Sequence, residues 1–213
     1  MKYLVKCLRG ALLTTSFFSV HAQSAPWASM TYERSGLNIP RWQIEVPQQG
    51  MATYSGKPLK GVDPGTVSFA ISPSGHDKLK SLLEASHGLQ PCETKSKGIA
   101  NMGQKTIAYT PAGGPEQRCS FNYSDNRALS DAAEYFIALA NTLQAGQQLD
   151  YMHRYDRLGL DAVITQLATE VKDHRAVELA TISSTLQRLV EDRNIMERVR
   201  SRAQHLLDLA AKE

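Results

Sequence analysis

The sequence predicts an α+β protein in which a small antiparallel sheet packs on a helix and an all-α C-terminal helical bundle follows. Most of the Gly and Pro residues fall between positions 27 and 125, where apolar residues alternate as they do in half-buried strands. From about residue 130 onward, apolar residues recur at helical spacing instead. These patterns divide the chain into a signal peptide at 1–22, an α+β sheet domain at 23–145 and a helical C-terminal module at 146–213.

The N-terminus is typical of a secretory signal peptide. Lys2, Lys6 and Arg9 precede an apolar run at 10–20 that is too short to span a bilayer. Val20 and Ala22 supply small residues at the positions that signal peptidases require, so we expect the mature chain to begin at Gln23. An N-terminal membrane anchor is the alternative interpretation. The predicted location is the periplasm or the extracellular medium.

The charge balance limits the class of partner. The chain has 24 Lys and Arg residues against 21 Asp and Glu residues, and no acidic residue precedes Glu33. Removal of the signal peptide therefore leaves a neutral protein. Neutrality argues against nucleic acid or an anionic membrane as the partner, and we expect no integral membrane segment in the mature chain.

The number and positions of the cysteines are consistent with a secreted protein. Cys7 leaves with the signal peptide, and the mature chain keeps Cys92 and Cys119. In an oxidising compartment, two cysteines in one domain most simply form a structural disulfide. A redox pair is the alternative, but such pairs usually have a closer spacing beside a helix N-terminus.

The first half of the mature chain contains several candidate strands. Alternation predicts strands at 29–34, around Trp42, Ile44 and Val46, around Val67, Phe69 and Ile71, at 104–109 and at 117–123. The last two flank 110–116, which has the Gly and Pro content of a hairpin loop. No candidate strand falls within 48–65. Between Ile71 and Cys92 the apolar period becomes helical, and Ser74 with Asp77 resembles a capping box.

The second half is predicted to be helical. We expect one helix from Ser130 to near Gly146, a second at 158–171, a third after Asp173, and a fourth with Asn194 as N-cap and Glu197 at N3. The last three resemble a HEAT-like helical hairpin with a cap. Between the two halves, the apolar side chains of four residues are expected to join the helical module to the sheet domain: Tyr151, Met152, Tyr155 and Leu158.

Candidate chemistry is sparse. Ser124-Asp125-Asn126 spells one element of class A β-lactamases, but the chain has no Ser-x-x-Lys, and a turn before a helix is the simpler interpretation. The histidines of the mature chain have no metal-ligand spacing: His76, His87, His153, His174 and His205. We therefore predict no catalytic residue, no cofactor and no metal site.

One segment carries a family resemblance. Met30-Thr-Tyr-Glu-Arg-Ser-Gly36 resembles the opening strand of emfourin-type proteins, which are inhibitors of protealysin- and thermolysin-type metalloproteases. The order of the expected elements extends the resemblance over about 30–145. It implies inhibition of a secreted metalloprotease through protruding loops, for which 48–65 and 110–116 are the candidates. No binding residue is carried over from the family.

Three functions are consistent with the sequence. The first is an exported, non-catalytic binding or interaction protein whose partner is another protein. The second is the metalloprotease inhibitor that the resemblance implies. The third is a hydrolase with a dispersed site, which should gather ionisable groups with shifted pKa values in a pocket.

Overall fold

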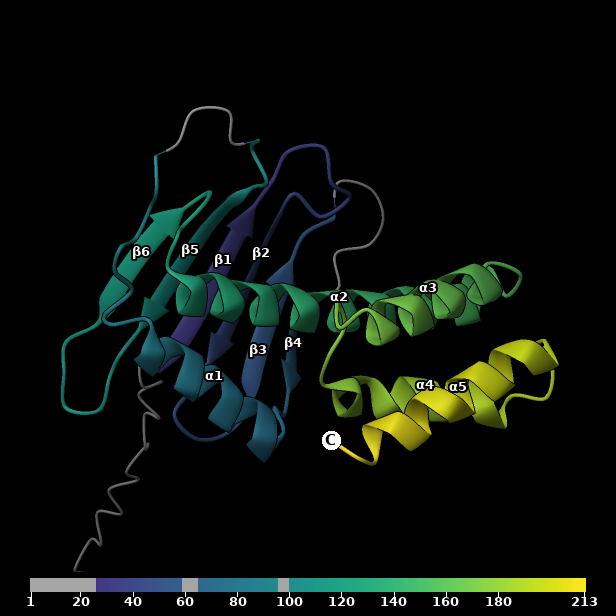
Figure 1. Ribbon diagram of the computed structural model, residues 1–213. Coiled ribbons are helices and arrows are strands. Elements are labelled where there is room, and N and C mark those ends of the chain that lie inside the picture. The colour runs from purple at the N-terminus through teal and green to yellow at the C-terminus, as the bar shows by residue number, and fades with distance from the viewer. Residues whose placement is uncertain (1–25, 59–64, 96–99) are drawn as a thin grey trace, which may run out of the picture.

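The computed structural model describes residues 26–58, 65–95 and 100–213 (Figure 1). The predicted signal peptide and its cleavage site at Ala22-Gln23 lie outside the described residues. In the described part of the chain, antiparallel strands form one sheet in the order β4-β3-β2-β1-β5-β6. The strands are β1 (Ala28–Glu33), β2 (Arg41–Val46), β3 (Ala52–Gly56), β4 (Thr66–Phe69), β5 (Gln104–Tyr109) and β6 (Gln117–Phe121). The α+β prediction is confirmed.

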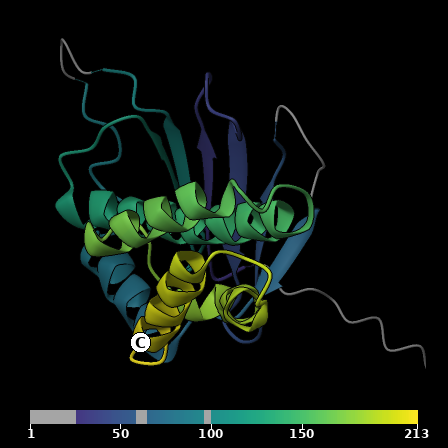
Figure 2. The same ribbon diagram turned by 90° about the vertical axis from the view of Figure 1, so that its right-hand side faces the viewer.

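One face of the sheet carries the core. Met30, Ile44 and Tyr54 lie opposite one another across three neighbouring strands and are fully buried. Helices α1 (Pro73–Ala85) and α2 (Arg127–Tyr155) cover this face, and α2 runs across the strands (Figures 1 and 2). The other face is polar, with Ser29, Thr31 and other short side chains that reach solvent, as the alternation of each strand requires.

Strand β3 is absent from the strands that we predicted. Residues Ala52–Gly56 are an inner strand between β2 and β4, and 59–64 lie outside the described residues. Its inward positions are Ala52, Tyr54 and Gly56, of which only Tyr54 is large. The alternation of large apolar residues that predicts a half-buried strand is therefore missing here. Gly56 is required there, since a Cβ at this position would lie 2.4 Å from the Tyr54 hydroxyl oxygen.

Helix α1 begins earlier than the predicted capping box. Its N-cap is Ser72, whose side-chain oxygen accepts a hydrogen bond from the Gly75 backbone N–H, and Pro73 occupies the first turn. The pairing of Ser74 with Asp77 was therefore wrong. Proline is favoured at the first position of a helix. Ser72 followed by Pro73 was therefore the sequence pattern that indicates the true start of α1.

We predicted that helix α2 ends near Gly146, but it continues to Tyr155. Gly146 is present for a different reason. A Cβ at this position would lie 2.4 Å from Cγ2 of Ile182, so the glycine allows the following helical segment to approach α2 closely. The boundary that we drew between 145 and 146 falls inside this single helix.

The C-terminal half is helical, as predicted. It contains α3 (Leu160–Lys172), the 3-10 helix η1 (Leu179–Ile182), α4 (Ser183–Glu191) and α5 (Glu197–Ala210). Asn194 is not the N-cap of α5, because Met196 holds that position and the Asn194 N–H binds Asp192 instead. The module has its own apolar core, with Leu149 of α2 among its members. Within the described residues, no helix is both long and apolar enough to cross a bilayer.

A buried carboxylate joins the helical module to the sheet domain. Glu178 is 5% exposed and adopts a left-handed conformation with φ 59°. Its side chain accepts hydrogen bonds from the Ser72 backbone N–H at 2.7 Å, from the Ser72 hydroxyl at 3.0 Å and from the Tyr135 hydroxyl at 2.9 Å. Glu178 therefore stabilises the first turn of α1, where the helix dipole favours negative charge.

We predict that Gly75→Ala destabilises the protein by about 1–3 kcal/mol, the usual cost of overpacking a filled site. An added Cβ would lie 1.9 Å from Oε1 of Glu178 and 2.3 Å from the Tyr135 hydroxyl oxygen. Helix propensity alone predicts the opposite sign, since Ala is favoured over Gly by up to about 1 kcal/mol. Urea unfolding measures the change, with the exposed Ser81→Ala in the same helix as control. A Gly75→Ala variant more stable than the parent would show that Glu178 does not occupy this position.

Candidate functional site

The C-terminal end of α2 presents large apolar side chains to solvent. Tyr151 is 50% exposed, Tyr155 is 72% exposed and Leu158, in the turn that follows, is 82% exposed. The prediction that these residues join the helical module to the sheet domain was wrong. Of the four, only Met152 packs, and it contacts the core of the module. We call Tyr151, Tyr155 and Leu158 the distal patch.

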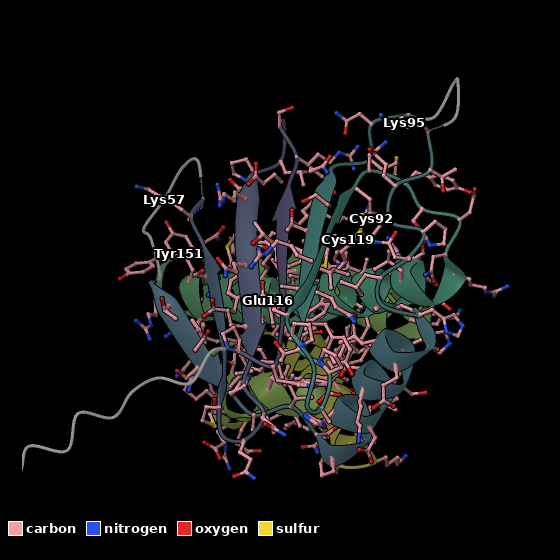
Figure 3. All side chains as sticks on the ribbon, turned by 90° about the vertical axis from the view of Figure 1, so that its left-hand side faces the viewer. Lys57, Cys92, Lys95, Glu116, Cys119 and Tyr151 are labelled. Carbon is pink, nitrogen blue, oxygen red and sulfur yellow. A yellow bond between two sulfur atoms is a disulfide. The ribbon has the colours of Figure 1, made fainter. Side chains whose placement is uncertain are left out.

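The distal patch stands at the end of the module, away from α1. The α2–α3 turn and the α4–α5 turn lie at this same end (Figure 1). Figure 3 views the molecule with the strands in front of the helices and shows Tyr151 projecting past one side of the sheet, the side that also carries Lys57. The two tyrosine rings lie 5.0 Å apart between centroids, at an angle of 48°. They therefore support each other without being covered.

Polar contacts hold the backbone beneath the distal patch. His153 Nε2 lies 2.8 Å from Oδ2 of Asp192, and Arg157 lies 3.7 Å from the same oxygen. The contact with His153 and the backbone N–H of Asn194 lower the pKa of Asp192 to about 2. Asp156 accepts a hydrogen bond from the Gly159 N–H and closes the turn. The patch is thus built on a fixed hairpin end.

Cys92 and Cys119 form a disulfide, as predicted, with 5.6 Å between their Cα atoms (Figure 3). Cys119 lies in β6, and Cys92 belongs to the segment that follows α1. Thr94 in the same segment donates its backbone N–H to the Tyr123 carbonyl oxygen at 2.9 Å. The bridge therefore fastens this segment beside β6.

We predict that replacing both cysteines, Cys92→Ser with Cys119→Ser, lowers the free energy of unfolding by about 3–4 kcal/mol, because the bridge restricts the unfolded chain. Chemical unfolding of the oxidised parent and of the double variant measures the change, with circular dichroism to show that helix content is retained. Two titratable thiols in the folded, exported parent would contradict the pairing.

Ser124-Asp125-Asn126 forms a turn before a helix, as interpreted. The Ser124 hydroxyl donates to the Pro91 carbonyl oxygen at 2.9 Å. Asn126 is the N-cap of α2, and its side-chain oxygen accepts from the Leu129 N–H. All three residues are accounted for by chain geometry.

The histidines lie in separate places. His76 stacks on Trp27 with 4.8 Å between ring centroids, and His87 and His174 occupy turns with positive φ. His205 lines a shallow, open depression of about 520 Å³ on α5, together with Glu197, Arg200, Gln204 and Asp208. Among the described residues, no three His, Cys, Asp or Glu side chains lie close enough together to hold a metal ion.

The largest pKa shifts have structural causes. Burial raises the pKa of Tyr54 to about 12. Burial, with Glu178 close by, also raises the pKa of Tyr135. Burial lowers the pKa of Lys105, whose ammonium donates to the Asn122 carbonyl oxygen at 2.8 Å. Tyr54 lies in β3, Lys105 in β5 and Tyr135 in α2, while Asp192 follows α4.

Of the two loops that the resemblance offered as inhibitory, 110–116 projects from the β5–β6 hairpin at the end of the sheet (Figure 1). Its turn closes through a hydrogen bond from the Gly114 N–H to the Pro111 carbonyl oxygen at 3.0 Å. Glu116 and Arg118 pair at 2.9 Å beside it. The other candidate, 48–65, contains β3, and its residues 59–64 lie outside the described part of the chain.

Comparison with known proteins returns no match: no family model, no curated protein and no solved structure is similar to this chain. Function therefore has to be argued from the geometry of the distal patch and its surroundings.

Proposed function

We propose that this chain is an exported, non-catalytic protein that binds another protein through the distal patch. The observation that carries the proposal is the exposure of three large apolar side chains within the eight residues from Tyr151 to Leu158. Exposed apolar side chains that gather in one place mark interaction sites, and tyrosine is among the residues that contribute most to binding energy at protein interfaces.

The fixed backbone under the patch favours binding. The contacts of His153 and Arg157 with Asp192, and the turn closed by Asp156, hold the patch before any partner arrives. A preorganised surface loses less conformational entropy on association than a mobile one. Arg154 and Arg157 surround the apolar side chains with polar groups that can stay in water at the rim of an interface.

The inhibitor hypothesis places the contact elsewhere. It would use the tip of loop 110–116, where Ala112 and Gly113 are exposed. The two proposals therefore make opposite predictions for substitutions at the two sites.

The test is affinity purification of envelope and culture-fluid proteins on the immobilised mature chain, with mass spectrometry of what is retained. We expect Tyr151→Ser with Leu158→Ser to reduce recovery of the retained partner at least tenfold, since truncating a central interface residue costs about 2 kcal/mol or more. Because both side chains are exposed, the unfolding midpoint should stay unchanged within error.

Tyr123→Ser is the matched control, because Tyr123 is also exposed, at 44%, but lies outside the patch. It should leave recovery unchanged. Loss of the partner with Ala112→Arg, together with retention by the patch variant, would overturn the proposal and favour the inhibitor. Recovery that none of these variants alters would also overturn it.

A further inference from the structure

The stripe of α2 that packs on the sheet continues beyond the sheet. Phe136, Ala140 and Leu143 are buried members of the sheet-domain core. Helical spacing places Gln147, Tyr151 and Arg154 on the same side of α2, one to three turns further on. Tyr151 is half exposed there, although Leu143 on the same stripe is buried. The helix thus presents a sheet-packing side where the chain supplies no strand in its described residues.

The length of α2 and the width of the sheet agree with a helix that extends beyond the sheet. A helix of 29 residues is about 43 Å long at 1.5 Å per residue. The sheet of six described strands is about 24 Å wide between the axes of its two edge strands, because neighbouring strands lie about 4.8 Å apart. Because α2 starts over the β5–β6 side and runs toward β4, its last turns extend past β4 (Figures 1 and 2).

Strand β4 is an open edge at that place. Thr66–Phe69 pair with β3 on one side, and no described residue pairs with the other side. The strand reads Thr-Val-Ser-Phe, without the charges or proline that usually keep an edge from pairing with other chains. Val67 and Phe69 lie opposite Tyr54 and Ala52, so their side chains point toward the helices.

The opposite edge is protected. Strand β6 carries the exposed Arg118, and the segment around Cys92 is held beside it by the disulfide and by the Thr94 hydrogen bond. The two edges of the sheet therefore differ, and Tyr151 projects past the unprotected one (Figure 3).

We propose that β4 accepts an extended segment of a partner protein as an added strand, with the inward side chains of that segment packed against Tyr151 and Tyr155. This inference rests on the proposed function and names its mode of binding. Strand addition uses backbone hydrogen bonds for affinity and alternate side chains for specificity. We expect alternate residues of the segment to be apolar, because Val67, Phe69 and Tyr151 line the inward side.

A second copy of this chain does not fit the same edge. The helical module extends past β4 on the helix side of the sheet (Figure 1). The α1 and α2 helices of a second copy joined edge to edge would have to occupy that space. An extended segment brings no helices and meets no such obstacle.

The test uses random twelve-residue peptides displayed on phage and selected on the mature chain, followed by fluorescence anisotropy with the synthetic peptides. We expect Ser68→Lys to weaken binding at least tenfold, because a charge on an edge strand opposes pairing. Ser120→Lys, an exposed serine on the opposite edge strand, should change binding less than twofold. Single N-methylation of the peptide amides should abolish binding at alternate positions, and amide exchange of 66–69 should slow on binding.

The outcomes separate the inference from the proposed function. If Tyr151→Ser weakens binding while Ser68→Lys and N-methylation do not, the patch binds in another mode and the strand-addition inference is overturned. If selection yields no peptide that depends on Ser68, the inference is likewise overturned. If light scattering shows a dimer of the mature chain that Ser68→Lys dissociates, a second copy occupies the edge. If the patch variant retains its partner in the affinity experiment, the proposed function fails on its own evidence.

Discussion

Helix α2 is the element on which the rest of the structure depends. Its N-terminal part covers the sheet with Phe136, Ala140 and Leu143, and further along it contributes Leu149 to the core of the helical module. A single rigid helix that belongs to two cores fixes how the two halves of the chain lie. It is also longer than the sheet is wide, so Tyr151 and Tyr155 near its end are exposed to solvent. Tyr151 lies on the side of the sheet where no described residue pairs with the outer edge of β4 (Figure 3).

The Glu178 carboxylate supplies the second connection between the halves. Glu178 has a left-handed backbone conformation and directly precedes η1. Its carboxylate accepts hydrogen bonds from Ser72, at the first turn of α1, and from the Tyr135 hydroxyl of α2. A hydrogen bond to a charged group contributes about 1.5–3 kcal/mol. Because Glu178, Ser72 and Tyr135 come from three separate elements, this contact opposes any hinge motion between module and sheet domain.

Alternation and helical period predicted β1, β2, β4, β5, β6 and the helical half, because their inward residues are mostly large. They missed β3, where Ala52 and Gly56 hide the pattern, and they ended α2 at Gly146 because a glycine that serves close packing resembles a helix stop. The disulfide followed from the predicted export to an oxidising compartment and from the two cysteines left in the mature chain. Sequence spacing grouped the residues of the distal patch correctly but predicted that they are buried between the two halves. Spacing alone cannot show that a helix extends beyond the edge of the sheet on which it packs.

Nitration of tyrosines by tetranitromethane, read by mass spectrometry on the folded mature chain, tests the overhang of α2 most directly. We expect Tyr151 and Tyr155 to react as readily as the exposed Tyr123, whereas the buried Tyr32, Tyr54 and Tyr135 should react only after unfolding. Protection of Tyr151 and Tyr155 in the isolated chain, at the level of Tyr54, would mean that these side chains pack between the two halves. That result would contradict both the overhang and the binding site built on it.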